Sequence, residues 1–249
     1  MEKKEFYRHY LPHYQQLGQA YFVTWCLKDA VPAKALHTYT LQLEMLKNQI
    51  SALGGANESG EFYSPQDNLD AVGNRATRSR NLGEENHPTE FEILKRKYYI
   101  LRKKYLKAFD DILDAERKPS VNLSKPCNTE ILIGSLKFWE GKRLTNLAFT
   151  IMSNHVHWVF ELKQKDEKGK AVYLQDLLQS VKGFSAYRIN KLENRQGSLW
   201  QKESFDTTIR NEIHLHNAIN YTLDNPVHAG LVADWKLWPG TWCGSGDWS

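Results

Sequence analysis

The sequence predicts an α+β protein, with a ferredoxin-like antiparallel sheet, helices on one face of that sheet and an inserted long helical hairpin. Three observations predict this class. Short segments rich in β-branched and aromatic residues alternate with helical patterns. Two strand-like segments, 144–152 and 155–162, are separated only by Ser153 and Asn154, which is typical of a tight hairpin. Finally, two helical apolar repeats flank a long polar stretch.

The sheet elements follow one another in the order β-α-β-β-α-β-α. The expected strands and helices are strand 20–27, a short helix from about 128, strands 144–152 and 155–162, helix 174–193, strand 204–209 and a last helix at 212–225 that Pro226 and the Gly230 region stop. In a split β-α-β arrangement, the strand at 155–162 is central. We therefore expect 1–39 and 128–249 to form one domain around this strand.

The inserted segment at 40–127 reads as two long helices that pack against each other. Each carries an apolar residue at alternating spacings of three and four. The two stripes are Tyr39, Leu43, Leu46, Ile50, Leu53 and Phe91, Leu94, Tyr98, Leu101, Tyr105, Ala108, Ile112. The Gly/Asn/Ser-rich stretch at about 54–89 predicts a flexible connection. The second helix also has a basic side (Lys95, Arg96, Lys97, Arg102, Lys103, Lys104 and Lys107), which is either a solvated face or a DNA site.

Composition limits the class of protein only loosely. Among 249 residues, 33 basic residues face 29 acidic ones, so a net charge of +4 permits nucleic-acid binding without requiring it. No apolar run is long enough to span a membrane, and the charged first residues are not followed by an apolar stretch, which argues against a secretory signal. Cys26, Cys127 and Cys243 are widely scattered, as expected of reduced thiols in a cytoplasmic protein.

The His-x-His pair at residues 155 and 157 is the first candidate site. Alternate residues of a strand share a face, so the two imidazoles lie about 7 Å apart along one side of the sheet. They are either ligands of one metal ion or two half-exposed polar residues. In the last helix, Tyr221 and Asn225 are four residues apart and also share a face. Two imidazoles and an amide oxygen suit Mn²⁺ or Mg²⁺, whereas a core tyrosine and a C-cap asparagine remain the alternative.

Several stretches together resemble the REP-associated tyrosine transposases, a group of single-tyrosine HUH (His-hydrophobe-His) endonucleases. In family order they are "GQAYFVTWCLKDAVP", "GKRLTNLAFTIMSNHVHWVF", "GSLWQKESFDTTIRN" and "YTLDNPVHAGLV". The resemblance spans most of 7–39 and 128–242. The segment 40–127 has no counterpart in the short members of that family.

The resemblance implies a metal-dependent enzyme that cuts and rejoins single-stranded DNA, at hairpin-forming repeats. It carries over His155, His157 and Asn225 as ligands of Mg²⁺ or Mn²⁺ and Tyr221 as the nucleophile that forms a 5′-phosphotyrosine. Tyr187 is the second candidate nucleophile. The alternatives are an inactive DNA-binding protein derived from such a transposase, or an interaction protein built around the helical hairpin.

Basic residues near these motifs are candidates for contact with the DNA backbone. They are Lys182, Arg188, Lys191 and Arg195 on the helix at 174–193 and just beyond it, together with Arg210, which could instead pair with Asp206. The expected partner is single-stranded or hairpin DNA rather than a membrane, and the choice between a monomer and a homodimer stays open.

Overall fold

The computed structural model describes residues 6–8, 12–14, 18–32, 34–53, 88–115, 119–202 and 204–244. Its chain divides into two compact units. One unit combines residues 1–31 with 113–249 and contains the sheet, and the other consists of residues 32–112. We call them the sheet unit and the helical unit, and describe each by itself.

The helices and strands largely follow the apolar patterns of the sequence. In chain order they are β1 (Phe6–Arg8), β2 (Pro12–Tyr14), β3 (Ala20–Cys26), α1 (His37–Ala52), α3 (Glu90–Asp114), α4 (Pro126–Lys137), β4 (Leu144–Ile151), β5 (His155–Leu162), α5 (Leu174–Leu192), β6 (Phe205–Ile209), α6 (Glu212–His228), the short 3₁₀ helix η2 (Trp235–Leu237) and β7 (Thr241–Cys243). β1 and β2 form a small antiparallel ribbon of their own.

The main sheet has the strand order β6-β3-β5-β4-β7, and every pairing within it is antiparallel. An antiparallel α+β fold was expected and is confirmed. The strands up to β6 follow the split β-α-β order, with β5 in the middle. β4 and β5 pair from Ile151 opposite Val156, so Ser153 and Asn154 form the tight connection that the sequence predicts.

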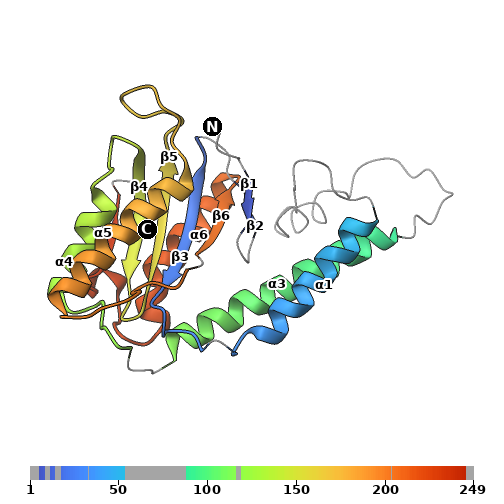
Figure 1. Cartoon of the computed structure of the whole chain (residues 1–249), viewed down its shortest axis with the longest axis horizontal. Coiled ribbons are helices and arrows are strands. Elements are labelled where there is room, and N and C mark those ends of the chain that lie inside the picture. The colour runs from blue at the N-terminus through green and yellow to red at the C-terminus, as the bar shows by residue number, and fades with distance from the viewer. Residues whose placement is uncertain are drawn as a thin grey trace. The chain divides into compact units, whose positions relative to one another are not determined.

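Helices cover both faces of this sheet, so the expectation of helices on one face was wrong (Figure 1). α4 and α5 lie side by side on the first face, where Asn146 donates a hydrogen bond to the Leu136 carbonyl of α4. α6 packs on the second face, where Ile219 joins Ala148 and Val159 in one core cluster. The reason is that the strands carry apolar side chains on both faces, so one layer of helices leaves Ala148 and Val159 exposed to water.

The last helix is also longer than its sequence suggests. Pro226 and the Gly230 region were expected to stop it. α6 continues through Pro226 to His228 and ends just before Gly230, which has a left-handed conformation with φ of 69°. A proline in a helix removes the one hydrogen bond that its own N–H would donate. Because the helix ends within the next turn, little of it lies beyond this interruption. Asn225 and Pro226 are both buried, which shows that packing against the sheet holds this last turn.

The helical unit contains α1 and α3, which run antiparallel beside each other (Figure 1). The rings of Tyr39 and Tyr105, from the predicted stripes, meet edge to face with centroids 6.2 Å apart. The unit ends near residue 112 rather than 127, because Val121 and Leu123 are buried and Leu123 bonds to Ser153 of the sheet unit. The connection expected at about 54–89 lies outside the described residues, except for its last two. Among the described helices, none has the length and apolar character needed to cross a membrane.

Candidate active site

Two buried histidines lie side by side on β5, on the sheet face that α6 covers. His155 and His157 are each only 1% exposed, and their Nε2 atoms are 3.0 Å apart. The sheet register places them opposite Cys26 and Thr24 of β3. The alternation of side chains along a strand explains why they share a face, and α6 explains why that face is dry. They are therefore not half-exposed polar residues.

Each histidine is held at its other nitrogen by a polar neighbour. The Nδ1 atom of His155 lies 2.6 Å from the side-chain oxygen of Asn154, whose amide nitrogen donates to the Leu113 carbonyl. An amide oxygen only accepts, so His155 carries its proton on Nδ1 and keeps a lone pair on Nε2. The Nδ1 atom of His157 lies 2.8 Å from the Thr24 hydroxyl, which can donate or accept. Such contacts orient metal-binding imidazoles.

Burial keeps both imidazoles neutral. It lowers the pKa of His155 to about 3, and the Asn225 side chain opposes this shift only in part. Burial also holds the pKa of His157 well below its usual range, and the neighbouring His155 lowers it further. A neutral imidazole with a free lone pair is the form that binds a metal ion.

The last helix brings Asn225 and Tyr221 to the same place. Asn225 is 2% exposed, and its side-chain oxygen has no hydrogen-bond partner. The ring of Tyr221 stands edge-on to that of His157, with centroids 5.3 Å apart, and edge-on to Phe22 at 5.8 Å. Tyr221 is half-buried. All four residues that the sequence singled out for the chemistry thus meet on one sheet face.

These donors fit a divalent ion. In octahedral coordination with bonds of about 2.1 Å, neighbouring ligand atoms lie about 3 Å apart, which is the spacing of the two Nε2 atoms. A buried, unpartnered amide oxygen costs stability, and an amide oxygen is chemically suited to bind a cation. Among the described residues, no three His, Cys, Asp or Glu side chains form a metal-binding group.

The basic residues proposed for DNA contact are not gathered around this site. Arg188 and Lys191 belong to α5, on the opposite face of the sheet, where Arg188 stacks on Phe184. Tyr187, the second candidate nucleophile, is on the same helix and 64% exposed. The sheet therefore separates these three residues from the histidines.

The other three candidates occupy different surroundings. The Lys182 ammonium group donates to the Gln201 carbonyl and the Ser204 hydroxyl, so it holds the segment that leads into β6. Arg195 is half-buried and donates to Asn190 at 3.4 Å. Arg210 is exposed in the connection between β6 and α6. Of the five, Arg210 alone directly precedes the helix that carries Tyr221.

Sequence reasoning missed the two residues that orient the histidines. Asn154 adjoins His155 in the sequence and was interpreted only as a turn residue. Thr24 gives no sequence signal, since only the pairing of β3 with β5 places it beside His157.

An antiparallel sheet between two helical layers, with a buried histidine pair, an unpartnered amide oxygen and a tyrosine on one face, defines an α+β protein with a candidate metal and nucleophile site. The resemblance to REP-associated tyrosine transposases is confirmed by distant homology. A Haemophilus influenzae protein named "Putative REP-associated tyrosine transposase" is 29% identical over 97 residues, which are 37% of this chain and 55% of the relative. The chain thus matches little more than half of that relative's length.

Two further comparisons add less. A solved structure of a REP-associated tyrosine transposase bound to a REP hairpin aligns with 96% of this chain and 82% of its own, at 13% identity and a TM-score of 0.39. That score is too low to assign a fold, so the architecture rests on the topology given above. No protein-family model matches the chain.

Proposed function

We propose that this protein is a metal-dependent transposase that cuts and rejoins single-stranded DNA through a covalent bond to Tyr221, at hairpin-forming repeats. One observation carries the proposal. The Nε2 atoms of His155 and His157, the unpartnered oxygen of Asn225 and the ring of Tyr221 converge on one largely buried place. The distant transposase relative supports the same reaction class.

His155, His157 and Asn225 would hold the ion. When bound, a divalent ion such as Mg²⁺ or Mn²⁺ supplies a Lewis acid that draws charge from a phosphodiester. Asn154 and Thr24 each contact the opposite nitrogen of one histidine and so orient both Nε2 atoms toward the same point. For His155 the Asn154 oxygen also fixes the proton on Nδ1, which leaves the Nε2 lone pair free. α6 and the sheet exclude water from the histidines, which are almost fully buried.

Tyr221 provides the nucleophile in this proposal. Its phenol oxygen forms a bond to the phosphorus, and the bond from phosphorus to the 3′-oxygen breaks. The phenol loses one proton in this step and the leaving 3′-oxygen takes up one proton to become a 3′-hydroxyl, so no net proton is released. The product is a 5′-phosphotyrosine, which a 3′-hydroxyl can attack to reverse the step and join strands. Packing against His157 and Phe22 fixes the ring in place for this step.

The decisive experiment traps the covalent product. The wild-type protein, with Mn²⁺, is incubated with labelled single-stranded oligonucleotides that contain hairpins, and protein–DNA bands are resolved under denaturing conditions. We expect Tyr221→Phe to abolish these bands and Tyr187→Phe to retain them, since Tyr187 lies exposed on the opposite helical layer. Sequencing the attached DNA then identifies the cleavage site.

Two results would contradict the proposal. If Tyr221→Phe still forms adducts while Tyr187→Phe does not, the nucleophile is misassigned. If the wild type binds hairpins yet forms no adduct with any metal ion, the protein is a DNA-binding derivative of a transposase. Tyr221→Phe and Tyr187→Phe each remove one oxygen, so the free energy of unfolding of each variant should lie within about 1 kcal/mol of the wild-type value.

A further inference from the structure

The helix α3 has an unusual distribution of charge. Between Ile93 and Phe109 it contains seven basic residues and no acidic residue. Five of the seven are exposed, and we call them the α3 basic face: Arg96, Lys97, Lys103, Lys104 and Lys107. Arg96, Lys103 and Lys107 lie opposite the buried residues of α3 around the helix, whereas Lys97 and Lys104 lie at its flank beside α1. The exposed surface of the middle of α3 is thus positively charged along its length.

Helix stability does not account for this distribution. Cations stabilise a helix in its last turn, near the negative end of its dipole. The last turn of α3 has no basic residue, and its final residues include Asp110, Asp111 and Asp114. Lys103 and Lys107 are four residues apart, so their like charges repel each other on neighbouring turns. A solvated helical face usually mixes both signs of charge, whereas the acids closest to this face, Glu92 and Asp111, lie only at its two ends.

We propose that the α3 basic face binds the sugar-phosphate backbone of DNA, as a contact separate from the active site. From Arg96 to Lys107 the helix rises about 17 Å, at about 1.5 Å per residue. That length corresponds to about five phosphates of one strand at their rise of about 3.4 Å. A row of flexible cations of this length can therefore follow a phosphate backbone, which fixes position without reading sequence.

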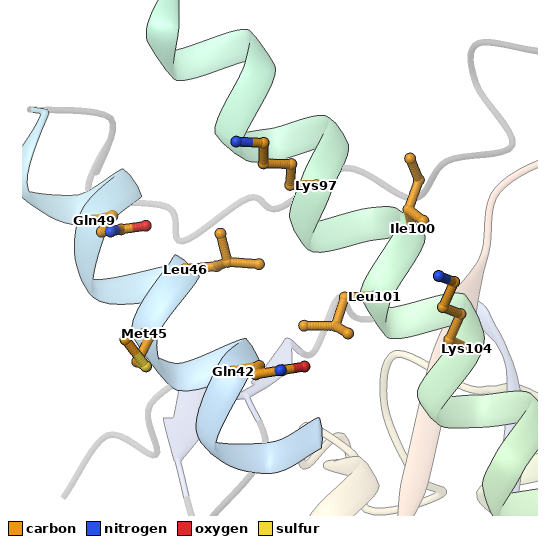
Figure 2. Close-up of a pocket in the computed structure, with 8 residues that line it drawn as sticks. All are labelled: Gln42, Met45, Leu46, Gln49, Lys97, Ile100, Leu101 and Lys104. Atoms are coloured by element: carbon orange, nitrogen blue, oxygen red, sulfur yellow. The ribbon is translucent and has the colours of Figure 1, made fainter. Parts of the chain in front are cut away.

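The groove between the two helices supports part of this surface. Lys97 and Lys104 line a hollow of about 390 Å³ between α1 and α3, in which Leu46 and Leu101 point toward each other (Figure 2). The hydrocarbon stems of lysines cover apolar surface while their ammonium groups stay in water. Leu46 and Leu101 therefore give the two lysines an apolar wall, and the charges are presented at its rim.

The inference rests on the proposed function in one respect, since that reaction brings the protein to DNA. Its test does not depend on catalysis. We would measure binding of the full chain to a random-sequence DNA duplex by fluorescence anisotropy over a series of salt concentrations. The variant is Arg96→Gln with Lys103→Gln and Lys107→Gln. The control is Lys165→Gln with Lys168→Gln and Lys170→Gln, which removes the same charge from an exposed loop of the sheet unit.

The α3 variant should bind at least about tenfold more weakly at low salt, and the slope of log affinity against log salt should become shallower by about 3, or about 0.9 per lost phosphate contact. The control should retain the wild-type slope. Both variants should keep the wild-type melting temperature. On α3 the helix propensity of glutamine is similar to those of arginine and lysine, and the three control lysines lie in an exposed loop. Equal slopes in the two variants would show that net charge alone matters and would overturn the proposal. Binding to vesicles of anionic lipid is measured in the same way. If the α3 variant binds DNA as the wild type does but no longer binds the vesicles, the α3 basic face contacts a membrane surface and the proposal is overturned. Absence of covalent adducts would count against the proposed function alone.

Discussion

Asn225 and Asn146 are both buried, but their side chains are satisfied very differently. The Asn225 oxygen has no partner. The Asn146 oxygen accepts from the Trp158 ring nitrogen at 2.6 Å, and its amide nitrogen donates to the Leu136 carbonyl. A buried polar group without a partner reduces stability, so a chain that keeps one at this place does so for a reason other than folding.

We therefore predict that Asn146 matters for stability and Asn225 for adduct formation. Asn225→Ala should change the free energy of unfolding by no more than about 1 kcal/mol, because the Asn225 oxygen meets no donor at good hydrogen-bonding geometry and its effect on His155 only opposes part of a pKa shift that burial dominates. Asn146→Ala should destabilise by about 2 to 3 kcal/mol, because it leaves Trp158 and Leu136 unpaired in the core. Urea unfolding measures both. Adduct formation should be lost with Asn225→Ala. A large destabilisation by Asn225→Ala would show that its amide is structural.

The two neutral histidines make stability depend on pH. The pKa of His155 falls from its ordinary 6.5 to about 3 on folding, so below pH 6.5 the unfolded chain binds the proton and the folded one does not. Stability is therefore complete above pH 6.5 and decreases as pH falls toward 3. At pH 5 the loss from His155 is about 2 kcal/mol.

Urea unfolding of the metal-free protein at pH 7.5 and pH 5 measures this loss. His155→Gln should make the decrease smaller, because glutamine does not titrate. The Asp29 carboxylate acts in a different pH range. Burial raises the pKa of Asp29, but hydrogen bonds, above all those from Ser120, outweigh it and lower the pKa, so the contribution of Asp29 to stability disappears only below about pH 4. Equal stability of the wild type at the two pH values would refute the neutral, buried pair.

At the scale of elements, the edge strand β7 depends on a close backbone approach. Gly240 accepts a hydrogen bond from the Ile151 N–H at 3.0 Å, and a Cβ atom there would lie 2.5 Å from the Ile151 carbonyl oxygen. Such a contact forces the two backbones apart. Gly134, within α4, has open space around the equivalent position.

Alanine at the two glycines should have opposite effects. Gly240→Ala should destabilise the protein by about 1 to 3 kcal/mol, because β7 must shift away from β4. Gly134→Ala should stabilise it by about 0.5 to 1 kcal/mol, because alanine loses less entropy in a helix. Thermal unfolding compares the two. Equal shifts of the melting temperature would mean that β7 is not held at Gly240.

At the scale of the whole molecule, the sheet unit has its own core, and hydrogen bonds within it hold together the two chain segments that flank the helical unit. Leu27 donates its N–H to the Asn154 carbonyl, and the Leu113 carbonyl accepts from the Asn154 side chain. Asn154 therefore makes hydrogen bonds to the chain just before the helical unit, at Leu27, and just after it, at Leu113. A short link can replace residues 32–112 without stretching these contacts.

We predict that a variant in which a Gly/Ser link replaces 32–112 folds and unfolds cooperatively, since the residues of the sheet core remain. It should form covalent adducts at high DNA concentration, and its binding should depend less on salt because α3 is missing. Circular dichroism and the adduct assay test both points. Failure of cooperative unfolding would show that the sheet unit depends on the helical unit.

The sequence by itself determined the elements and the chemical groups of the site. Alternation placed His155 and His157 on one strand face, spacing placed Tyr221 and Asn225 on one helix face, and β5 has the predicted limits. These are local properties, because the period of a strand or a helix follows from the backbone alone. The motifs also sufficed to recognise the distant transposase relative.

The tertiary structure alone decided which face each helix covers and what surrounds the site. α6 lies on the second face because apolar residues from several strands together need a cover, which no single segment reveals. That packing buries the histidines, lowers their pKa values and leaves the Asn225 oxygen without a partner. Thr24 reaches His157 only through the pairing of distant strands, and long-range register is not encoded in either strand by itself.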